Sequence, residues 1–582
     1  MTDFSIVIGG EAGMGIMTTG AIFSRIASQS GYHVFDYVEY PSLIRGGHNA
    51  YEARIAEEEV GTLCPTVDLL VCLNEDTYVR HKSKLHPDSV VIYDNEEFTI
   101  SDDCQRIAVP FKKILQELKG QAVMKNTIAI GAALAATGTD LSRLNTILEK
   151  QFAKKGEEII NFNKKFAEMG FNHVETNYPL LVKNLLAGKP AETKLVISGN
   201  EAFSLGSIIA DCRLYAAYPM TPASTVLTTM AAWQEKTGII VRHSEDEIAA
   251  INTVIGASFA GARSSTGTSG GGFALMVESV SLAGVTEMPV VIFIASRPGP
   301  ATGMPTWTEQ GDLLFAVHAG HGEFPKIVLA PGDVYEMLEL TAKAYNLADI
   351  YQLPVIILSD MYLSESHRTL TKSFLDSLIT GYKIERGKTE ESSKFKDQSS
   401  KYLRYKITDD GISPRLIPGA PGIYYQANSY EHLEDGHTTE EAKPRIDQVH
   451  KRSRKIDTYF KNHFQSPAVF GDLGKSDTVF VGWGSTKWPI LEAQKQLKNQ
   501  GKETAFVHFT HVYPLSKELV QPFFPAGKRY VLVENNSQGQ FGKLLRAETG
   551  ISVNENILRY DGRMVTPEEI VSRVNGLTSS RV

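Results

Sequence analysis

The chain has 582 residues, 42% of them hydrophobic and 22% charged, which is the composition of an ordinary globular protein. This length exceeds what one hydrophobic core supports and predicts roughly three or four domains. A net charge of -8 argues against nucleic acid or an anionic membrane as a partner. No apolar run approaches the ~20 residues that cross a bilayer, and the N-terminus shows no signal segment. We therefore expect a cytoplasmic protein.

The four cysteines are scattered and form no C-x-x-C pair. This usage suits a reduced compartment, and it lacks the clusters that hold iron–sulfur centres. We expect the four to be small apolar residues and expect no metal site on this chain. If electrons pass through an iron–sulfur cluster, another chain must hold it. The residues are Cys64, Cys72, Cys104 and Cys212.

The first part of the chain, residues 1–188, alternates short apolar strands with amphipathic helices. Strands are expected over 4–8, 67–73 and 90–93, and a helix from about 16 to 31. This alternation predicts an α/β domain with a parallel, doubly wound sheet.

A second α/β domain is expected over residues 193–380. Its apolar runs at 289–295, 326–330 and 354–359 lack polar alternation, which is typical of central parallel strands buried on both faces. Helices are expected near 274–285 and 333–347.

Residues 381–462 turn polar, and we expect a connector on the surface rather than another core. A last α/β domain is expected over 463–582. Its strands are predicted at 477–482, 504–509 and 529–534. The fold class is thus α/β, with three doubly wound units and one connector.

An apolar strand at 214–217 runs directly into Tyr218-Pro219-Met220-Thr221-Pro222. Each proline fixes its own φ and restricts the residue before it, so this loop has little freedom. The hydroxyl of Thr221 and the backbone amide of Met220 would then face a ligand. Alternatively, Thr221 only caps a helix that begins at Pro222. The motif by itself leaves both interpretations open.

Acidic residues Glu245 and Glu247 precede a helix that is rich in small residues. They either complement the helix dipole or include a buried carboxylate that shares a proton. Small residues favour the second interpretation, because they let the helix pack tightly and keep the space around its first turn dry. These residues are Ala249, Ala250, Gly256, Ala257, Ala260 and Gly261.

Two glycine-rich loops, 264–272 and 297–309, each adjoin a strand of the second domain. Ligands bind in open α/β sheets at the carboxyl ends of the strands. With Thr221 and Glu247, these loops make four segments that we expect to converge on one pocket.

The N-terminal loop 9–20 contains Gly13 and Gly15 between the first strand and the first helix. Thr18 stands where the dinucleotide pattern counted from Gly13 needs its third glycine, and the P-loop ending is absent. Helix N-terminal amides can still hold an anion. A ligand site and a purely structural turn are equally open.

A second loop, 38–49, places Arg45 and His48 on either side of two glycines. Such a loop offers charge while its backbone approaches a ligand or partner closely. An interface role for Arg45 is at least as well supported as a catalytic one.

Three of these motifs resemble signatures of the 2-oxoacid:ferredoxin oxidoreductases. Residues 218–222 resemble the family's Y-P-[IM]-T-P motif, 299–306 resemble its second loop, and 40–48 are similar to the signature of its γ domain. The resemblance points to the large subunit in which a γ-type domain precedes the α part. It covers nearly the whole chain, is weakest in 381–462, and includes a transketolase C-terminal-like domain from 463.

The resemblance implies a thiamine diphosphate enzyme that decarboxylates a 2-oxoacid, transfers the acyl group to coenzyme A and reduces ferredoxin. The reverse reaction, a reductive carboxylation, is equally open chemically. The family's Gly-Asp-Gly motif for the diphosphate and Mg²⁺ is absent from this chain. A separate β subunit is therefore implied to carry the diphosphate site, Mg²⁺ and a [4Fe-4S] cluster, in an (αβ)₂ assembly.

The resemblance also implies roles for individual residues. Glu247, with Glu245 as the fallback, would bind the aminopyrimidine ring and stabilise the imino tautomer that removes the thiazolium proton. Thr221 would hydrogen-bond the 2-oxoacid. The remaining candidates are Tyr218, Met220, Arg297 and Trp307 for substrate, Pro219, Gly270 and Gly271 for cofactor, and Gly13, Gly15, Arg45 and His48 for coenzyme A or an interface.

One departure concerns substrate choice. Trp307 stands where some relatives have an arginine that contacts substrate, which weakens a 2-oxoglutarate assignment, although 2-oxoglutarate stays slightly favoured. Residues 534–536 are expected to support contacts between subunits. Two alternatives are kept: a thiamine diphosphate carboligase subunit that needs no ferredoxin, and a non-catalytic assembly subunit that relies on loop 9–20.

Overall fold

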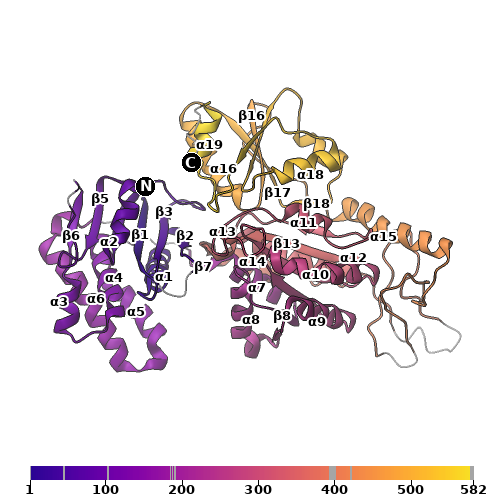
Figure 1. The fold of residues 1–582 in the computed structure, drawn as a ribbon, viewed down its shortest axis with the longest axis horizontal. Helices are drawn as coiled ribbons and strands as arrows, with labels where there is room; N and C mark the ends of the chain where they lie inside the picture. The colour runs from indigo at the N-terminus through magenta and orange to yellow at the C-terminus, as the bar shows by residue number, and fades with distance from the viewer. Residues whose placement is uncertain are drawn as a thin grey trace. The chain divides into compact units, whose positions relative to one another are not determined.

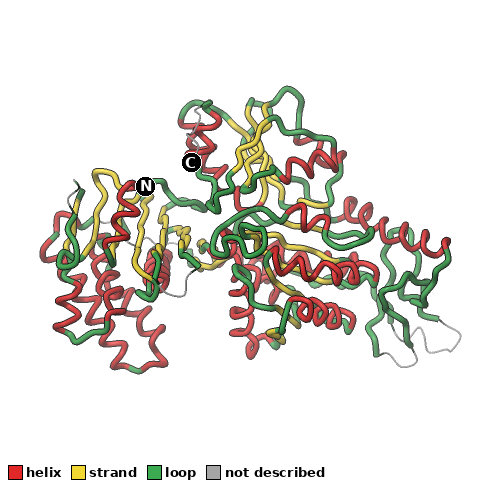
Figure 2. Tube along the Cα trace, viewed as in Figure 1, coloured by secondary structure: helices red, strands yellow, loops and turns green. Residues whose placement is uncertain are grey.

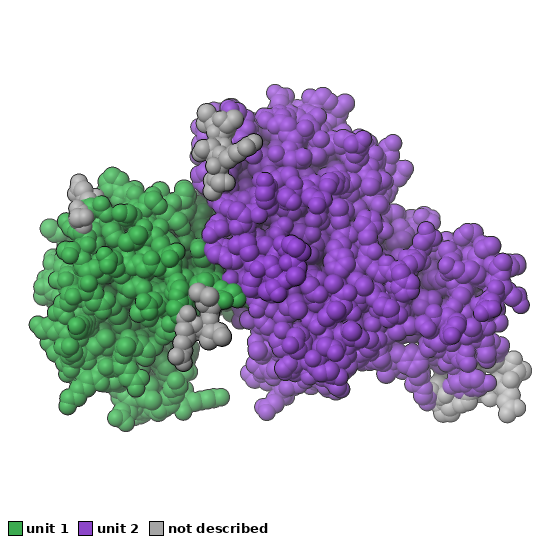
Figure 3. All heavy atoms as spheres, in the orientation of Figure 1, with its two compact units in different colours: residues 1–198, 365–377 green, residues 199–364, 378–582 purple. Residues whose placement is uncertain are grey.

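A computed structural model describes residues 2–42, 46–100, 102, 104–183, 185–186, 188, 192–391, 401–419 and 423–576. The chain forms two compact units (Figure 3). The N-terminal unit comprises Met1–Ser198 and Glu365–Ser377, and the main unit comprises Gly199–Ser364 and Leu378–Val582. The N-terminal unit thus continues past residue 188 and includes a segment that is distant in sequence. In the described ranges, no helix combines the length and hydropathy needed to cross a membrane.

The N-terminal unit contains an eight-stranded sheet of order β6-β5-β4-β1-β3-β2-β14-β7. The bounds are β1 Asp3–Glu11, β2 His33–Glu39, β3 His48–Ala56, β4 Val67–Cys72, β5 Leu85–Tyr93, β6 Gln105–Ala108, β7 Lys194–Ser198 and β14 His367–Thr371. The half from β6 to β1 is parallel, as predicted. The other half is antiparallel, so the expectation of a wholly parallel sheet is wrong there. A short loop joins β2 to β3, and such a loop can only connect antiparallel strands.

Helices α1 (Ile16–Gln29), α2 (Glu75–His81), α3 (Phe111–Glu117), α4 (Lys125–Ala136), α5 (Leu141–Phe152) and α6 (Glu157–Asn177) complete this unit. The predicted helix from residue 16 is confirmed by α1. Helices α4 and α6 pack backbone to backbone. A Cβ on Gly131 would lie 2.0 Å from the Ala167 carbonyl oxygen, and one on Gly170 would lie 2.1 Å from that of Ile128. Only glycine allows this approach.

The main unit is built around a seven-stranded sheet of order β18-β12-β13-β11-β10-β8-β9. The bounds are β8 Leu214–Ala217, β9 Ile240–His243, β10 Ser264–Thr268, β11 Val290–Ser296, β12 Ile327–Leu329, β13 Pro354–Asp360 and β18 His511–Tyr513. Every pairing is parallel except β12 with β18. Strands β11, β12 and β13 are buried along their whole length, which confirms the prediction from their continuous apolar runs.

Helices alternate with these strands along the chain (Figure 2). They are α7 (Gly199–Ile209), α8 (Ser224–Thr237), α9 (Glu247–Phe259), α10 (Gly270–Val285), α11 (Leu313–His318), α12 (Val334–Tyr351) and α13 (Met361–Glu365). Helix α14 (Lys372–Gly381) follows β14, and most of it belongs to the N-terminal unit. The helices predicted at 274–285 and 333–347 lie within α10 and α12.

The C-terminal part of the main unit has a five-stranded sheet of order β15-β17-β16-β19-β20. The bounds are β15 Ala468–Phe470, β16 Thr478–Trp483, β17 Thr504–Phe509, β19 Arg529–Glu534 and β20 Glu555–Leu558. Helices α16 (Lys487–Asn499) and α19 (Pro567–Val574) lie on one side of this sheet and α18 (Gln540–Thr549) on the other (Figure 1). Strand β18 and a shared hydrophobic core join this part to the seven-stranded sheet.

The connector 381–462 is not the surface excursion that its composition predicts. Its helix α15 (Ala442–Asn462) inserts two buried lysines toward Glu287, with Lys451 Nζ 2.5 Å and Lys455 Nζ 2.6 Å from its carboxylate oxygens. Arg404 is also buried and donates to the Glu287 carbonyl oxygen at 2.8 Å. Charged residues indicated solvent in the sequence, but here they pair with one another inside the unit. Most of the polar run 390–400 lies outside the described residues.

Candidate functional site

The loop 218–222 follows the carboxyl end of β8 in the main unit. Helix α8 begins at Ser224 and has Ala223 as N-cap, without a side-chain cap. The alternative in which Thr221 caps a helix that starts at Pro222 is therefore wrong. Asn200 Nδ2 fixes the loop by donating to the Pro222 carbonyl oxygen at 2.8 Å. Tyr218 is exposed and Thr221 half-buried, so both side chains can reach a ligand.

Arg297, at the end of β11, joins the second loop to the first. Its Nη1 donates to the carbonyl oxygen of Thr221 at 2.7 Å. Burial lowers the pKa of this guanidinium, and the nearby Asp312 carboxylate opposes that shift. The structure therefore uses Arg297 to hold the backbone of loop 218–222 in place.

Glu247 is the first residue of α9. Asp246 caps this helix, and its side chain accepts from the amide of Ala249 at 2.7 Å. The Glu247 side chain is only 3% exposed, and among the described residues its Oε1 has no hydrogen-bond partner. The fallback candidate Glu245 is instead exposed, and its Oε2 lies 4.0 Å from Nη2 of Arg242. Burial of an unpaired carboxylate oxygen is costly and indicates a partner that is not part of this chain.

The glycine turn that opens α10 lies between the buried carboxylate of Glu247 and the half-buried Asp312. A Cβ on Gly272 would lie 2.6 Å from Glu247 Oε1, and one on Gly270 would lie 2.4 Å from Asp312 Oδ1. Gly271 is exposed, and the nearest atom to its Cβ would be the Ala301 carbonyl oxygen at 3.7 Å. The turn thus brings Glu247 and the loop from Arg297 to one place, as the sequence predicted.

Two acidic residues, Glu309 at the end of the second loop and Asp312 just after it, were missed in the sequence. Burial raises the pKa of Asp312, and burial together with the Asp312 charge raises the pKa of Glu309 to about 7. No spacing pattern marked them. The only available signal was two carboxylates within four residues of a loop already expected to line the pocket.

The second loop folds back on itself and is tied to the C-terminal part of the unit. Met304 N donates to the Pro298 carbonyl oxygen at 3.0 Å, and Thr308 N donates to that of Gly562 at 2.9 Å. The guanidinium carbon of Arg563 lies 4.2 Å from the centre of the Trp307 ring. Trp307 therefore packs under an arginine from the C-terminal part.

The segment 534–536 also binds this loop. Asn535 N donates to Gln310 Oε1 at 2.9 Å, and Asn536 Nδ2 donates to the Gln310 carbonyl oxygen at 3.0 Å. All three of its side chains are buried, and Glu534 accepts from Trp483 Nε1 at 3.0 Å. The expected role in contacts between subunits is therefore wrong, because these side chains support a loop of their own chain.

Apolar side chains are exposed beside the glycine turn. Asn252 Nδ2 of α9 donates to Ser279 Oγ of α10 at 3.0 Å. Ile248 and Leu275 lie one turn before these two residues, so they occupy the same face, and they are 49% and 53% exposed. The tight packing expected along α9 is absent at Gly256, whose Cβ would meet no described atom within 4 Å. This face is open.

In the N-terminal unit, Gly13 and Gly15 lie in the loop between β1 and α1 with φ of +93° and +74°. Gly15 is the N-cap of α1, and no side chain caps the helix. A pocket of about 630 Å³ adjoins the helix start, and its lining includes Gly15, Thr18, Thr19, Lys119 and Lys155. The glycine loop therefore borders a cavity of ligand size.

His48 does not offer a charge from its loop. Its side chain is buried, and its Nε2 lies 2.9 Å from Nε2 of His81. Burial, followed by the charge of Arg80, lowers the pKa of His48, which favours the neutral ring. The expectation of a charged group is wrong for His48. Arg45 lies outside the described residues.

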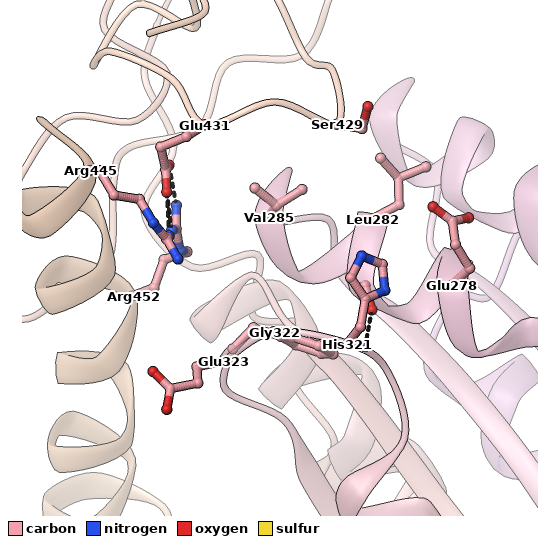
Figure 4. A pocket seen from close by; sticks show the side chains of 12 residues that line it. Glu278, Leu282, Val285, His321, Gly322, Glu323, Ser429, Glu431, Arg445 and Arg452 are labelled. Atoms are coloured by element: carbon pink, nitrogen blue, oxygen red, sulfur yellow. Dashed lines mark hydrogen bonds and ion pairs between the residues drawn. The ribbon is translucent and has the colours of Figure 1, made fainter. Parts of the chain in front are cut away.

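Another cavity, of about 230 Å³, lies between α10 and the connector (Figure 4). Part of its lining is Glu431, which forms ion pairs with Arg445 and Arg452. Figure 4 shows Glu278 and His321 on the opposite side. None of the predicted site residues that the structure describes lines this cavity.

Two family models match the chain. Residues 5–173 match the pyruvate ferredoxin/flavodoxin oxidoreductase model, and residues 206–451 match the thiamine diphosphate-binding model of the pyruvate flavodoxin/ferredoxin oxidoreductases. The alpha subunit of 2-oxoacid:ferredoxin oxidoreductase 2 from Aeropyrum pernix is 32% identical over 99% of this chain and 97% of its own length. That of Saccharolobus solfataricus is 32% identical over 97% of this chain and 96% of its own.

A solved structure is similar over the full length. It is the 2-oxoglutarate:ferredoxin oxidoreductase of Magnetococcus marinus with 2-oxoglutarate, coenzyme A and succinyl-CoA bound, with a TM-score of 0.91 and 31% identity over 99% of this chain and 100% of that one. The chain belongs to the 2-oxoacid:ferredoxin oxidoreductase family, as an alpha subunit with a fused γ-type domain. This confirms the resemblance carried by its three loops.

Proposed function

We propose that this chain, together with a β subunit, oxidises a 2-oxoacid to an acyl-coenzyme A and CO₂ and reduces ferredoxin, with 2-oxoglutarate the favoured substrate. The observation that carries the proposal is Glu247, a buried carboxylate with an unpaired oxygen beside an exposed glycine turn. The reverse carboxylation uses the same groups. We place the enzyme in the cytoplasm.

The residues around Glu247 fit the aminopyrimidine part of thiamine diphosphate. Thiamine diphosphate, when bound, supplies the electron sink that lets a 2-oxoacid lose CO₂. Glu247 Oε1 is a buried acceptor in need of a donor, and a ring nitrogen that carries a proton satisfies it. Gly271 is exposed beside Glu247 and leaves room there, since its Cβ would meet only the Ala301 carbonyl oxygen at 3.7 Å, and Pro219 and Gly270 are assigned to the cofactor with it. Glu247 would hold the proton at that nitrogen.

The substrate side is assigned to the Tyr218–Pro222 loop. Thr221 offers its hydroxyl to the carboxylate or carbonyl of the 2-oxoacid, while Tyr218 and Met220 line the approach. Arg297 fixes Thr221 through its carbonyl oxygen at 2.7 Å and adds positive charge close to the substrate carboxylate. Trp307 closes the other end of the second loop.

A β subunit completes the site in this proposal. The chain lacks a diphosphate motif, so the diphosphate, Mg²⁺ and the [4Fe-4S] cluster are assigned to the partner, in an (αβ)₂ assembly. The exposed Ile248 and Leu275 support a partner that covers this face, because large apolar side chains gathered at a site indicate an interface. The open surface at Gly256 supports the same assignment.

Coenzyme A is assigned to the N-terminal unit. The uncapped start of α1 at Gly15 offers free amides to a phosphate, and Gly13 leaves the loop open because its Cβ would meet no described atom within 4 Å. Lys119 and Lys155 in the adjoining pocket would supply positive charge to the phosphate groups. The pocket is large enough for part of this ligand.

The test is anaerobic reduction of a viologen dye by the complex of this chain with its β subunit. We expect reduction with 2-oxoglutarate that requires thiamine diphosphate and coenzyme A and yields succinyl-coenzyme A. Carbon–carbon bond formation without an electron acceptor would instead establish the carboligase alternative. Full activity of the β subunit without this chain would establish the assembly role.

A further inference from the structure

The guanidinium of Arg563 lies over the ring of Trp307, a residue of the second loop, and forms no salt bridge within the described part of the chain. We infer that Arg563 binds a second carboxylate of the substrate and so selects 2-oxo dicarboxylates over monocarboxylates. This inference rests on the proposed function, because it takes loop 218–222 as the place where the 2-oxoacid binds.

The position of Arg563 is fixed at its backbone and at its ring contact. Asn535 Nδ2 donates to the Arg563 carbonyl oxygen at 2.6 Å, and Arg563 N donates to Asp561 Oδ1 at 3.0 Å. Its guanidinium carbon lies 4.2 Å from the centre of the Trp307 ring. An aromatic face holds a guanidinium while its donors point outward in the guanidinium plane.

Those donors remain largely available. Nη1 donates to the Asp561 carbonyl oxygen at 3.1 Å, which occupies one of the five N–H groups. The nearby Asp561 carboxylate is taken by Arg559, whose Nε and Nη2 lie 2.9 Å and 3.0 Å from its two oxygens. Within the described part of the chain, no carboxylate pairs with the Arg563 guanidinium, and the residue is exposed.

One loop connects Arg563 to Thr221. The loop begins at Arg297, which donates to the Thr221 carbonyl oxygen at 2.7 Å, and ends at Trp307 beneath Arg563. It is compact, because Met304 N donates back to the Pro298 carbonyl oxygen at 3.0 Å. A substrate bound at Thr221 by its 2-oxoacid end would therefore point its tail along this loop.

The guanidinium of Arg563 is suited to bind a carboxylate at the end of the substrate that is distant from its 2-oxoacid group. An arginine fork binds a carboxylate through two parallel hydrogen bonds, which Lys and neutral side chains cannot reproduce. Trp307 cannot itself bind a substrate carboxylate by charge, and its ring instead holds the Arg563 guanidinium in position. Arg563 is a specificity residue, and Trp307 is the positioning residue.

The experiment compares 2-oxoglutarate with 2-oxobutyrate, which has the same carbon skeleton without the second carboxylate. Viologen reduction by the reconstituted complex is measured for the wild type, Arg563→Met and Arg563→Lys. Loss of a charged hydrogen-bonded pair predicts a fall of about 10- to 100-fold in kcat/KM for 2-oxoglutarate with Arg563→Met. The rate with 2-oxobutyrate should stay within about twofold, and Arg563→Lys should recover part of the loss. Arg573→Met, an exposed arginine of α19, is the matched control and should behave as wild type.

The outcomes separate this inference from the proposed function. Equal losses on both substrates, or no loss on 2-oxoglutarate, would overturn the role of Arg563. A wild-type complex that oxidises 2-oxobutyrate but not 2-oxoglutarate would overturn it as well, while leaving the oxidoreductase assignment in place. A wild-type complex that oxidises neither substrate would refute the proposed function itself.

Discussion

Glu247 and Glu287 are both buried in the main unit, with exposed fractions of 3% and 0%, yet their surroundings differ. Glu287 lies between Lys451 and Lys455, and its backbone carbonyl oxygen accepts from Arg404. Glu247 has an oxygen without a partner in the described part of the chain and lies beside an open face. Burial alone therefore does not separate the two carboxylates. The oxygen of Glu247 that has neither a hydrogen bond nor an ion pair in the described residues supports its proposed role at the cofactor.

The pKa of Glu287 reflects two opposing effects, burial and the charges of the neighbouring lysines. Burial favours the protonated acid, but the ammonium groups of Lys451 and Lys455 outweigh it and lower the pKa. The carboxylate is thus ionised because the connector supplies its counter-charges. This pairing joins α15 to the end of α10, and it gives the polar connector a structural role that the sequence did not reveal.

The largest effect on the stability of the folded chain is expected when the ion pairs of Glu287 with Lys451 and Lys455 are broken. Glu287→Gln leaves two buried ammonium groups without their counter-charge, and removal of one partner from a buried ion pair costs about 3–5 kcal/mol. We expect a clearly lower unfolding temperature of the isolated chain, measured by circular dichroism. Glu323→Gln, an exposed glutamate of the same unit, is the control and should melt like the wild type. An unchanged melting temperature for Glu287→Gln would remove the distinction between the two buried glutamates.

A smaller effect on stability, which depends on pH, is expected for Glu534. This third buried glutamate accepts hydrogen bonds from neutral donors rather than from lysines. Burial raises its pKa from 4.5 to about 7, so the folded chain holds a proton there that the unfolded chain has lost. Stability should therefore fall as pH rises from about 4.5 to about 7. At about 1.4 kcal/mol per pKa unit, the loss is about 3 kcal/mol.

Glu534→Gln should flatten this pH dependence, because glutamine stays neutral throughout. The measurement is the difference in unfolding temperature between wild type and variant at pH 5 and pH 8. The wild type should lose more stability than the variant over this interval. Parallel curves for the two proteins would mean that Glu534 is not protonated in the folded chain.

The smallest effect on folding is expected at the glycine turn. A Cβ on Gly272 would lie 2.1 Å from Thr268 Oγ1 and 2.6 Å from Glu247 Oε1, so Gly272→Ala must displace Glu247 at a cost of about 1–3 kcal/mol. We expect a modest fall in melting temperature together with a large loss of viologen reduction. Gly271→Ala is the folding control, since its Cβ would make only an ordinary contact at 3.7 Å. Wild-type turnover in Gly272→Ala would show that the position of Glu247 does not matter.

The sequence predicted the parts of this fold that depend on local patterns. Continuous apolar runs located β11 and β13, and the motif at Tyr218–Pro222 located the loop after β8. The antiparallel half of the first sheet was missed in part because β2 pairs with β14, which lies over 300 residues later in the sequence. The burial of Lys451 was missed because its counter-charge, Glu287, lies far away in the sequence.

The site was predicted to a similar degree. Glu247 was preferred to Glu245 because its distances to Ala250 and Gly256 match the E-x-x-A…G spacing of the thiamine enzymes that the chain resembles. The structure adds that only Glu247 is buried. Arg563 carries no local signal, because its significance arises from a ring contact with a residue 256 positions earlier (563 less 307). Such contacts are properties of the folded chain, so no motif reports them.

The most direct test of the central claim is the turnover of Glu247→Gln in the reconstituted complex with 2-oxoglutarate and coenzyme A. Glutamine keeps the size of the side chain but cannot hold a proton at the cofactor ring, and loss of such a group typically costs about 10²–10⁴-fold in rate. We predict this loss of turnover in a variant whose melting temperature and co-purification with the β subunit stay at wild-type values. Wild-type turnover in the assembled variant would contradict it.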